Sequence, residues 1–237
     1  MPSSHWRQIE NIIDIIYTMK PKSVLDIGCG NGKYGFLTRE YLDLWGEQEK
    51  NIQLDGIEIY EPYLTKIHYQ LYDKIIVGDV RKVLNNLIGK YDLALMIDII
   101  EHFDKNEAFT IIFQCLSICD NLLIATPKLF YKQNDCKNIY EQHLSHWKEK
   151  DFKSIANDNI FFHSNKRTVI CLIGKDSEEI RKLILQKQDR MWKRLIKKIF
   201  AVIFFPYGIY LICKKTCQKL SRLWGEMIDA EEYLLSD

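Results

Sequence analysis

Short apolar runs and amphipathic segments alternate along the first 125 residues. Apolar positions at helical spacing over 9–17 predict a first helix, which Pro21 ends. Five apolar runs then predict strands: Ser23–Ile27, Gln53–Ile59, Lys74–Gly78, Tyr91–Ile97 and Asn121–Ala125. The segments between them predict helices: about Lys33–Leu44, Pro62–Tyr72, Arg81–Ile88 and Lys105–Cys119. Runs without polar alternation are typical of a parallel sheet that helices cover on both faces.

The pattern changes after residue 126. Residues 126–147 are polar and aromatic without a clear period, and they predict a loop over the edge of the sheet. A short helix is expected at Glu149–Ala156, followed by a strand pair, Ile160–His163 and Thr168–Gly174, with a tight connection. We therefore expect one α/β domain over residues 1–175.

Residues 176–237 predict a helical C-terminal appendage that is both basic and apolar. Between Arg181 and Arg222 lie twelve Lys and Arg residues and one acid, and the run 199–213 carries no charge. Fifteen residues interrupted by Pro206 and Gly208 are too few to span a bilayer, which takes about 20. Two uses stay open: contact with an anionic membrane surface through 190–222, or packing on the core or in a homodimer.

Composition narrows the class of protein. A chain of 237 residues that is 47% hydrophobic suits one well-filled domain with an appendage. The net charge of +1 gives no general signal for binding a polyanion. Seven cysteines without a CxxC pair, and no secretory signal, predict reduced thiols in the cytoplasm, at the membrane periphery if the appendage contacts lipid.

A glycine-rich turn follows the first strand in the segment Leu25-Asp26-Ile27-Gly28-Cys29-Gly30-Asn31-Gly32. A buried strand that enters such a turn and opens a helix is suited to holding a nucleotide-like cofactor. A literal GxGxxG over 30–35 makes a dinucleotide oxidoreductase the first rival. Its pyrophosphate would be repelled by Asp26, whereas the ammonium and sulfonium groups of S-adenosylmethionine would be attracted.

This segment resembles motif I of the class I S-adenosylmethionine-dependent methyltransferases, and the resemblance covers roughly residues 20–175. It implies a Rossmann-like, mostly parallel seven-stranded sheet closed by an antiparallel hairpin, with S-adenosylmethionine as the cofactor. Gly28, Gly30 and Gly32 would form the cofactor turn beside Asp26.

Three further acids follow the next strands. By the resemblance, Glu58 accepts the ribose hydroxyls, Asp79 faces the adenine amino group with Val80 near the ring, and Asp98 lies close to the methionyl part. Any one of these acids would also suit a solvated strand end. Four acids at the same edge of one sheet favour the cofactor site.

Two segments offer groups that could take a proton from an acceptor. Asp98-Ile-Ile-Glu101-His102 resembles the acid-x-x-Glu-His element of many small-molecule methyltransferases. A comparable element binds a divalent metal in the ubiquinone-pathway O-methyltransferases, but its first position here is Asp, and we expect no metal. The second segment, His143-Leu-Ser-His-Trp147, contributes His143, with Trp147 as a packing anchor. Glu101, His102 and His143 are the catalytic candidates, and hydrogen bonding to backbone is the alternative for each histidine.

These patterns predict a methyltransferase that moves a methyl group to a small or lipid-linked acceptor, at oxygen. An RNA methyltransferase is the first alternative, and it is disfavoured because the basic residues of the appendage flank an apolar run. A non-catalytic scaffold that binds the cofactor is the second, and the four acids argue against it. The acceptor, its reacting atom and the oligomeric state stay open.

Overall fold

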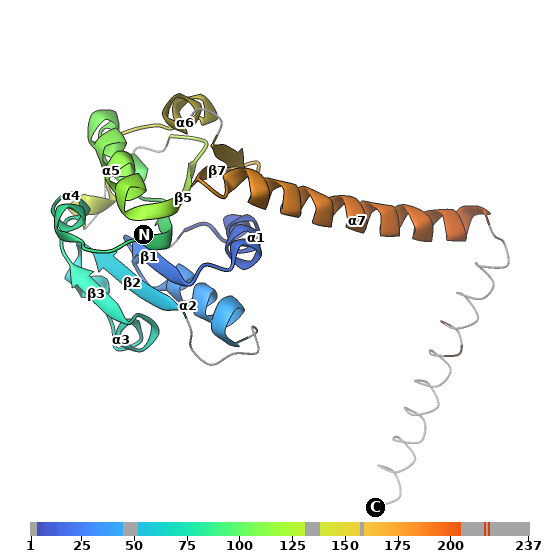
Figure 1. The fold of residues 1–237 in the computed structure, drawn as a ribbon, viewed down its shortest axis with the longest axis horizontal. Helices are drawn as coiled ribbons and strands as arrows, with labels where there is room; N and C mark the ends of the chain where they lie inside the picture. Colours follow the sequence, from blue (N-terminus) through green and yellow to red (C-terminus); the bar gives the residue numbers. More distant parts are fainter. Residues whose placement is uncertain are drawn as a thin grey trace, which may run out of the picture. The chain divides into compact units, whose positions relative to one another are not determined.

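The computed structural model describes residues 4–44, 52–130, 138–156, 159–204, 216 and 218. Its centre is a seven-stranded sheet with the order β3-β2-β1-β4-β5-β7-β6 (Figure 1). The strands are β1 Ser23–Ile27, β2 Gln53–Glu58, β3 Lys74–Val77, β4 Tyr91–Ile97, β5 Cys119–Pro127, β6 Ile160–Phe162 and β7 Thr168–Gly174. The pairs β1–β2, β1–β4, β2–β3 and β4–β5 are parallel, and β7 is antiparallel to both β5 and β6. This topology confirms the predicted mostly parallel sheet with a closing hairpin.

Helices cover both faces of this sheet, as the uninterrupted apolar strands predict (Figure 1). The helices are α1 Ile9–Met19, α2 Lys33–Arg39, α3 His68–Leu71, α4 Val80–Val83, α5 Lys105–Ile118, α6 Glu149–Ala156 and α7 Ser177–Phe204. Leu25 of β1 packs into the core shared with α4, α5 and α6, whereas its neighbour Val24 packs into the core on the side of α1. Successive side chains of a strand point to opposite faces, so each strand feeds both cores.

The chain divides into two compact units, Met1–Ile184 and Leu185–Asp237. The first unit includes the first two turns of α7, because Ile180 and Ile184 are buried in the core on the α1 side. Among the described residues, no helix combines the length and the apolar character needed to cross a bilayer. Most of the apolar run 199–213 lies outside the described residues.

Two of the predicted helices are wrong in extent. Instead of one helix over 62–72, a 3₁₀ turn at Glu61–Tyr63 is followed by the short α3. The His68 ring causes this break: its Nδ1 accepts from the backbone N of Thr65 at 3.0 Å, and its Nε2 lies 2.9 Å from the carbonyl oxygen of Gly30. The bond to Gly30 holds the segment against the glycine turn, and the local bond to Thr65 replaces helical continuity before His68.

The helix predicted over 81–88 is also shorter, because α4 passes into a 3₁₀ turn, η4, at Leu84–Asn86. The side-chain amides of Asn85 and Asn86 donate to the carbonyl oxygens of Arg81 and Lys82, at 3.1 and 3.0 Å. Asparagine competes in this way with the backbone for helical acceptors. The helix therefore ends soon after it begins.

A buried guanidinium joins α2 to the segments that precede β2 and β3. Arg39 donates to Asp43 at 2.9 Å, to Asp73 at 2.8 Å and to the carbonyl oxygens of Ile52 and Leu71, at 2.6 and 2.8 Å. Arg39 and Asp43 are both buried. A guanidinium with this many fixed acceptors holds the region rigidly behind the glycine turn.

Replacing Arg39 by methionine should lower the free energy of unfolding by about 3–5 kcal/mol, because Asp43 is left as a buried charge without its guanidinium. Urea denaturation measures this difference. Arg181→Met is the matched control, since Arg181 is half-exposed and pairs only with Glu178 on the same helix, and it should change stability by less than about 1 kcal/mol. Equal losses in the two variants would contradict the role given to Arg39.

Candidate functional site

Almost all of the predicted site residues line one cavity of about 870 Å³ at the carboxyl ends of β1, β2 and β4. Ligands of open α/β sheets bind at this edge, where the strand order reverses between β1 and β4. The residues that reach the cavity are Asp26, Gly28, Gly30, Glu58, Asp79, Val80, Asp98, Glu101, His102 and His143. Gly32 does not line it and lies instead at the N-terminus of α2.

The glycine turn has a conformation that other residues rarely adopt. Gly28, Gly30 and Gly32 have φ values of +69°, +54° and +75°. A Cβ on Gly28 would also lie 2.1 Å from Cδ1 of Ile99, which follows β4. Gly28 is therefore required both by its backbone conformation and by the close approach of the β4 segment.

Glu58 joins the end of β2 to the glycine turn. Its Oε2 accepts from the backbone N of Gly30 and its Oε1 from the backbone N of Tyr60, both at 2.8 Å. The carboxylate is buried and reaches the cavity. Each oxygen keeps a second lone pair for a ligand hydroxyl.

Asp26 is a fully buried carboxylate below the glycine turn. Burial raises its pKa from 3.8 to about 6, the charge of Glu58 adds to the rise, and a hydrogen bond from Tyr72 opposes it. The Tyr72 hydroxyl donates to Oδ2 at 2.6 Å. Gly35 makes this possible, because a Cβ there would lie 2.2 Å from the same hydroxyl. The third glycine of the literal GxGxxG therefore accommodates a tyrosine ring rather than a ligand.

Asp98 ends β4 in a strained conformation, with φ at +55°. Its Oδ2 accepts from Nε2 of Gln8 at 2.8 Å, and Gln8 in turn accepts from the Thr168 hydroxyl at 3.0 Å. Its Oδ1 is buried and has no hydrogen-bond partner among the described residues. Burial raises the pKa of this carboxyl, and hydrogen bonding to Gln8 and Ser4 together with the charges of Lys33 and His5 opposes the rise. A buried carboxylate oxygen without a donor at a cavity wall suits a cationic ligand.

Asp79 already has a partner on the protein. It caps α4 by accepting from the backbone N of Arg81, and the Arg81 guanidinium binds both carboxylate oxygens, at 2.5–3.0 Å. These hydrogen bonds hold the pKa of Asp79 below its ordinary value. Arg81 also binds Glu107 at 2.7 Å. Asp79 thus brings much less uncompensated charge to the cavity than Asp98 does, while Val80 beside it is buried and apolar.

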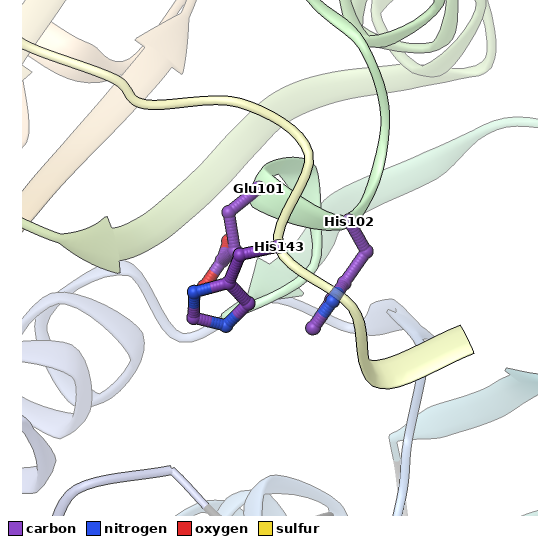
Figure 2. A group of neighbouring side chains, drawn as sticks. All are labelled: Glu101, His102 and His143. Atoms are coloured by element: carbon purple, nitrogen blue, oxygen red, sulfur yellow. The ribbon is translucent and has the colours of Figure 1, made fainter. Parts of the chain in front are cut away.

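Glu101, His102 and His143 form a cluster in which the side chains come from two separate segments of the chain (Figure 2). Glu101 and His102 belong to the 3₁₀ turn η5 (Ile100–His102), and His143 lies on the loop before α6. One ligand atom from each lies within 4.8 Å of the other two. Within the described part of the chain, these three side chains form the one group whose ligand atoms lie close enough together to hold a metal ion.

The loop that carries His143 is fixed to η5 by main-chain hydrogen bonds. The backbone N atoms of Leu144 and Ser145 donate to the carbonyl oxygen of Glu101, at 2.7 and 3.0 Å. Trp147 is fully buried, and its indole N donates to the Ser145 hydroxyl at 2.8 Å. The prediction that Trp147 anchors this loop by packing is confirmed.

Several residues that shape the site escaped sequence analysis. Gln8, Tyr72 and Ile99 hold or limit the predicted site residues, and His68 binds the turn at Gly30. Tyr63 is a further case, because its hydroxyl bonds to Glu141 and accepts from the Asn138 amide at 3.2 Å, at the cavity wall. Ile99 occupies a variable position of the acid-x-x-Glu-His element and the others lie in no motif, so only their positions in the fold identify them.

Of the four described thiols, Cys29 lines the cavity beside Asp26 and Glu58. Cys29, Cys115, Cys119 and Cys171 are free and buried, and burial holds the pKa of each well above its ordinary value. A thiol of raised pKa is a poor nucleophile. Reduced cysteines were expected, and these four agree; Cys136, Cys213 and Cys217 lie outside the described residues.

Asp26→Asn should stabilise the protein at neutral pH. The folded-state pKa lies above the unfolded value, so the folded protein alone holds this proton between about pH 4 and 6, and stability falls as pH rises through that window. Above pH 6 the penalty is complete, up to about 3 kcal/mol for a shift of about two pH units. Thermal unfolding should show the variant more stable at pH 7.5 and equal to the parent near pH 4. A variant that is less stable at pH 7.5 would contradict the buried charge.

The sequence matches no protein-family model and no curated protein. Solved structures do resemble it. An O-methyltransferase family protein from Burkholderia thailandensis superposes with a TM-score of 0.54 at 14% identity, covering 72% of this chain and 57% of that one. The N-terminal domain of EvdMO1, crystallised in the presence of SAH and D-fucose, gives 0.53 at 11% identity and covers 73% and 84%.

PH0226 protein from Pyrococcus horikoshii OT3 gives a TM-score of 0.50 at 18% identity and covers 73% and 92% of the two chains. The present chain spans little more than half the length of the Burkholderia protein, so that likeness concerns the shared domain alone. The strand order, the glycine turn after β1 and these superpositions agree. The first compact unit has the class I S-adenosylmethionine-dependent methyltransferase fold.

Proposed function

We propose that the chain binds S-adenosylmethionine in this cavity and transfers its methyl group to a hydroxyl of a small or lipid-linked acceptor. One observation carries the proposal: buried carboxylates from β1, β2 and β4 converge on one cavity, and Oδ1 of Asp98 has no donor among the residues described there. A cation satisfies this arrangement, whereas a pyrophosphate would be repelled by it.

The resemblance assigns a contact to each cofactor residue. Asp98 would accept from the ammonium of the methionyl part, and Glu58 would accept the ribose hydroxyls through lone pairs that the amides of Gly30 and Tyr60 leave available. Val80 would pack on the adenine ring, with Asp79 near its amino group. The likeness to a structure crystallised with SAH supports the same choice of ligand.

S-adenosylmethionine, when bound, supplies an electrophilic methyl group on a sulfonium sulfur. The chain's own residues must then exclude water, align the acceptor and take its proton. The methyl group would pass to the acceptor oxygen while the electron pair of its former bond stayed on sulfur, and the hydroxyl proton would go to a basic atom of the site. His102 and His143 supply such atoms at the cavity wall, and burial lowers the pKa of His102, which keeps its ring neutral.

Asp98→Asn should weaken binding of S-adenosylhomocysteine tenfold or more, about 1.4 kcal/mol, because an amide replaces the carboxylate that would face the ammonium. Asparagine tolerates positive φ and still accepts from Gln8, so the fold should persist. Titration calorimetry at pH 7.5 measures the affinities. Asp189→Asn, an exposed carboxylate outside the cavity, is the control. Unchanged affinity in Asp98→Asn would refute the assignment of the site.

We also propose that the second unit contacts an anionic membrane surface, which would suit a lipid-linked acceptor. In α7, exposed apolar side chains at 185, 192, 196 and 199 recur at intervals of seven, four and three residues and share one helical face. The opposite face is basic, with Lys187, Arg190, Lys193, Arg194, Lys197 and Lys198. A helix that is apolar on one face and cationic on the other binds at the interface of anionic lipid.

The double variant Trp192→Ser/Ile196→Ser should lose sedimentation with vesicles that contain phosphatidylserine, because it removes the centre of the apolar face. Removing 190–222 should have the same effect. Gln186→Ser, on the basic face, is the matched control and should sediment like the parent chain. If the parent chain itself stays in the supernatant, or if both variants sediment equally, the membrane proposal fails.

A further inference from the structure

We propose that Glu101, His102 and His143 bind one divalent transition-metal ion at the acceptor side of the cavity. The proposal starts from their placement: one carboxylate oxygen and two imidazole nitrogens, from two segments of the chain, lie within 4.8 Å of one another (Figure 2). Ligands about 2.1 Å from one ion lie at most about 4.2 Å apart, so a slight approach of the side chains completes the site.

Glu101 is the strongest argument for a cation. Its side chain is buried to 2% exposure, Oε2 accepts from the Thr126 hydroxyl at 3.1 Å, and Oε1 has no partner within the described part of the chain. A buried carboxylate oxygen without a donor is costly unless a ligand compensates it. The Glu101 carboxylate lies beside the His143 ring, and the His102 ring lies on the other side of that ring (Figure 2).

The surrounding hydrogen bonds orient two parts of this cluster. His102 Nδ1 lies 3.2 Å from the carbonyl oxygen of Gln142, which orients the imidazole ring. The carbonyl oxygen of Glu101 accepts from the amides of Leu144 and Ser145, which fixes the loop beside His143. Ligating histidines in metal sites are oriented by carbonyl partners in this way.

The geometry changes the expectation drawn from sequence. No metal was expected, because the first position of the acid-x-x-Glu-His element is Asp98 rather than glutamate. Asp98 is bonded to Gln8 and lies outside the cluster, and His143, forty-one residues along the chain from His102, takes part instead. Two of the three ligands therefore belong to the local element, and the third lies outside it.

The donor set also limits which ion fits. Two imidazoles and one carboxylate suit borderline ions such as Zn²⁺, Co²⁺ and Mn²⁺, whereas Mg²⁺ and Ca²⁺ prefer oxygen ligands. Three protein ligands leave coordination positions open to water or to an acceptor hydroxyl. An ion there would lower the pKa of a bound hydroxyl, and His102 and His143 would then serve as its ligands rather than as the proton acceptors. This catalytic part rests on the proposed function, whereas the binding of the ion does not.

The test is a titration of the full chain, freed of metal with a chelator, without cofactor. Co²⁺ should bind one to one at micromolar concentration or tighter, with the visible absorption of a coordinated ion, and Zn²⁺ should compete with it. Mg²⁺ at the same concentration should not compete. Glu101→Gln and His143→Gln should each weaken Co²⁺ binding about 100-fold or more, since each removes a ligand. His146→Gln is the matched control, because His146 lies on the same loop but bonds to the carbonyl oxygen of Lys128.

Three results would overturn the proposal: no Co²⁺ binding at millimolar concentration, equal binding by the ligand variants and the His146 control, or competition by Mg²⁺ as strong as that by Zn²⁺. His143→Gln decides the matter if Glu101→Gln does not fold, because His143 lies on a partly exposed loop. Titration of the metal-free chain with S-adenosylhomocysteine separates the two claims. Failure there refutes the proposed cofactor and leaves the metal site standing.

Discussion

Negative charge buried at the carboxyl edge of the sheet is the constraint on which the rest of the site depends. Asp26 and Glu58 are almost wholly inaccessible to solvent, and Asp98 is half-buried with its Oδ1 atom buried. Each is held by a different device: a tyrosine hydroxyl, two backbone amides and a glutamine amide. These hydrogen bonds lower the cost of burial but do not cancel it, since the pKa of Asp26 stays raised. An empty cavity is therefore electrostatically unsatisfied, and a cationic ligand removes the deficit.

The close packing around these buried acids explains two of the glycines in this region. Gly28 lets Ile99 pack against the turn, and Gly35 lets Tyr72 reach Asp26. Arg39 also stabilises this region, because it fixes α2, the helix that follows the glycine turn, to the residue before β2. The acceptor side is built differently, because the loop that carries His143 is attached to η5 by main-chain bonds and by the buried Trp147. The residues expected to contact the cofactor and those on the acceptor side of the cavity are therefore held in place by different interactions.

Sequence could predict the sheet well, because strands buried on both faces leave uninterrupted apolar runs; β1, β4 and β7 begin and end where expected. It also found the acids, since each follows a strand. It failed where tertiary bonds override local preference, as at His68, which breaks the helix expected over 62–72. Gln8 and Tyr72 lie 90 and 46 residues along the chain from Asp98 and Asp26, to which they donate hydrogen bonds. No local sequence pattern predicts contacts between residues so far apart.

The most direct test of the account compares two ligands on the unaltered chain. Titration calorimetry at pH 7.5 with S-adenosylmethionine, and separately with NAD, asks whether the buried acids select a cation over a pyrophosphate. The account predicts micromolar binding of S-adenosylmethionine and none of NAD. Binding of NAD without binding of S-adenosylmethionine would contradict it, and the charge at the carboxyl edge of the sheet would then need another explanation.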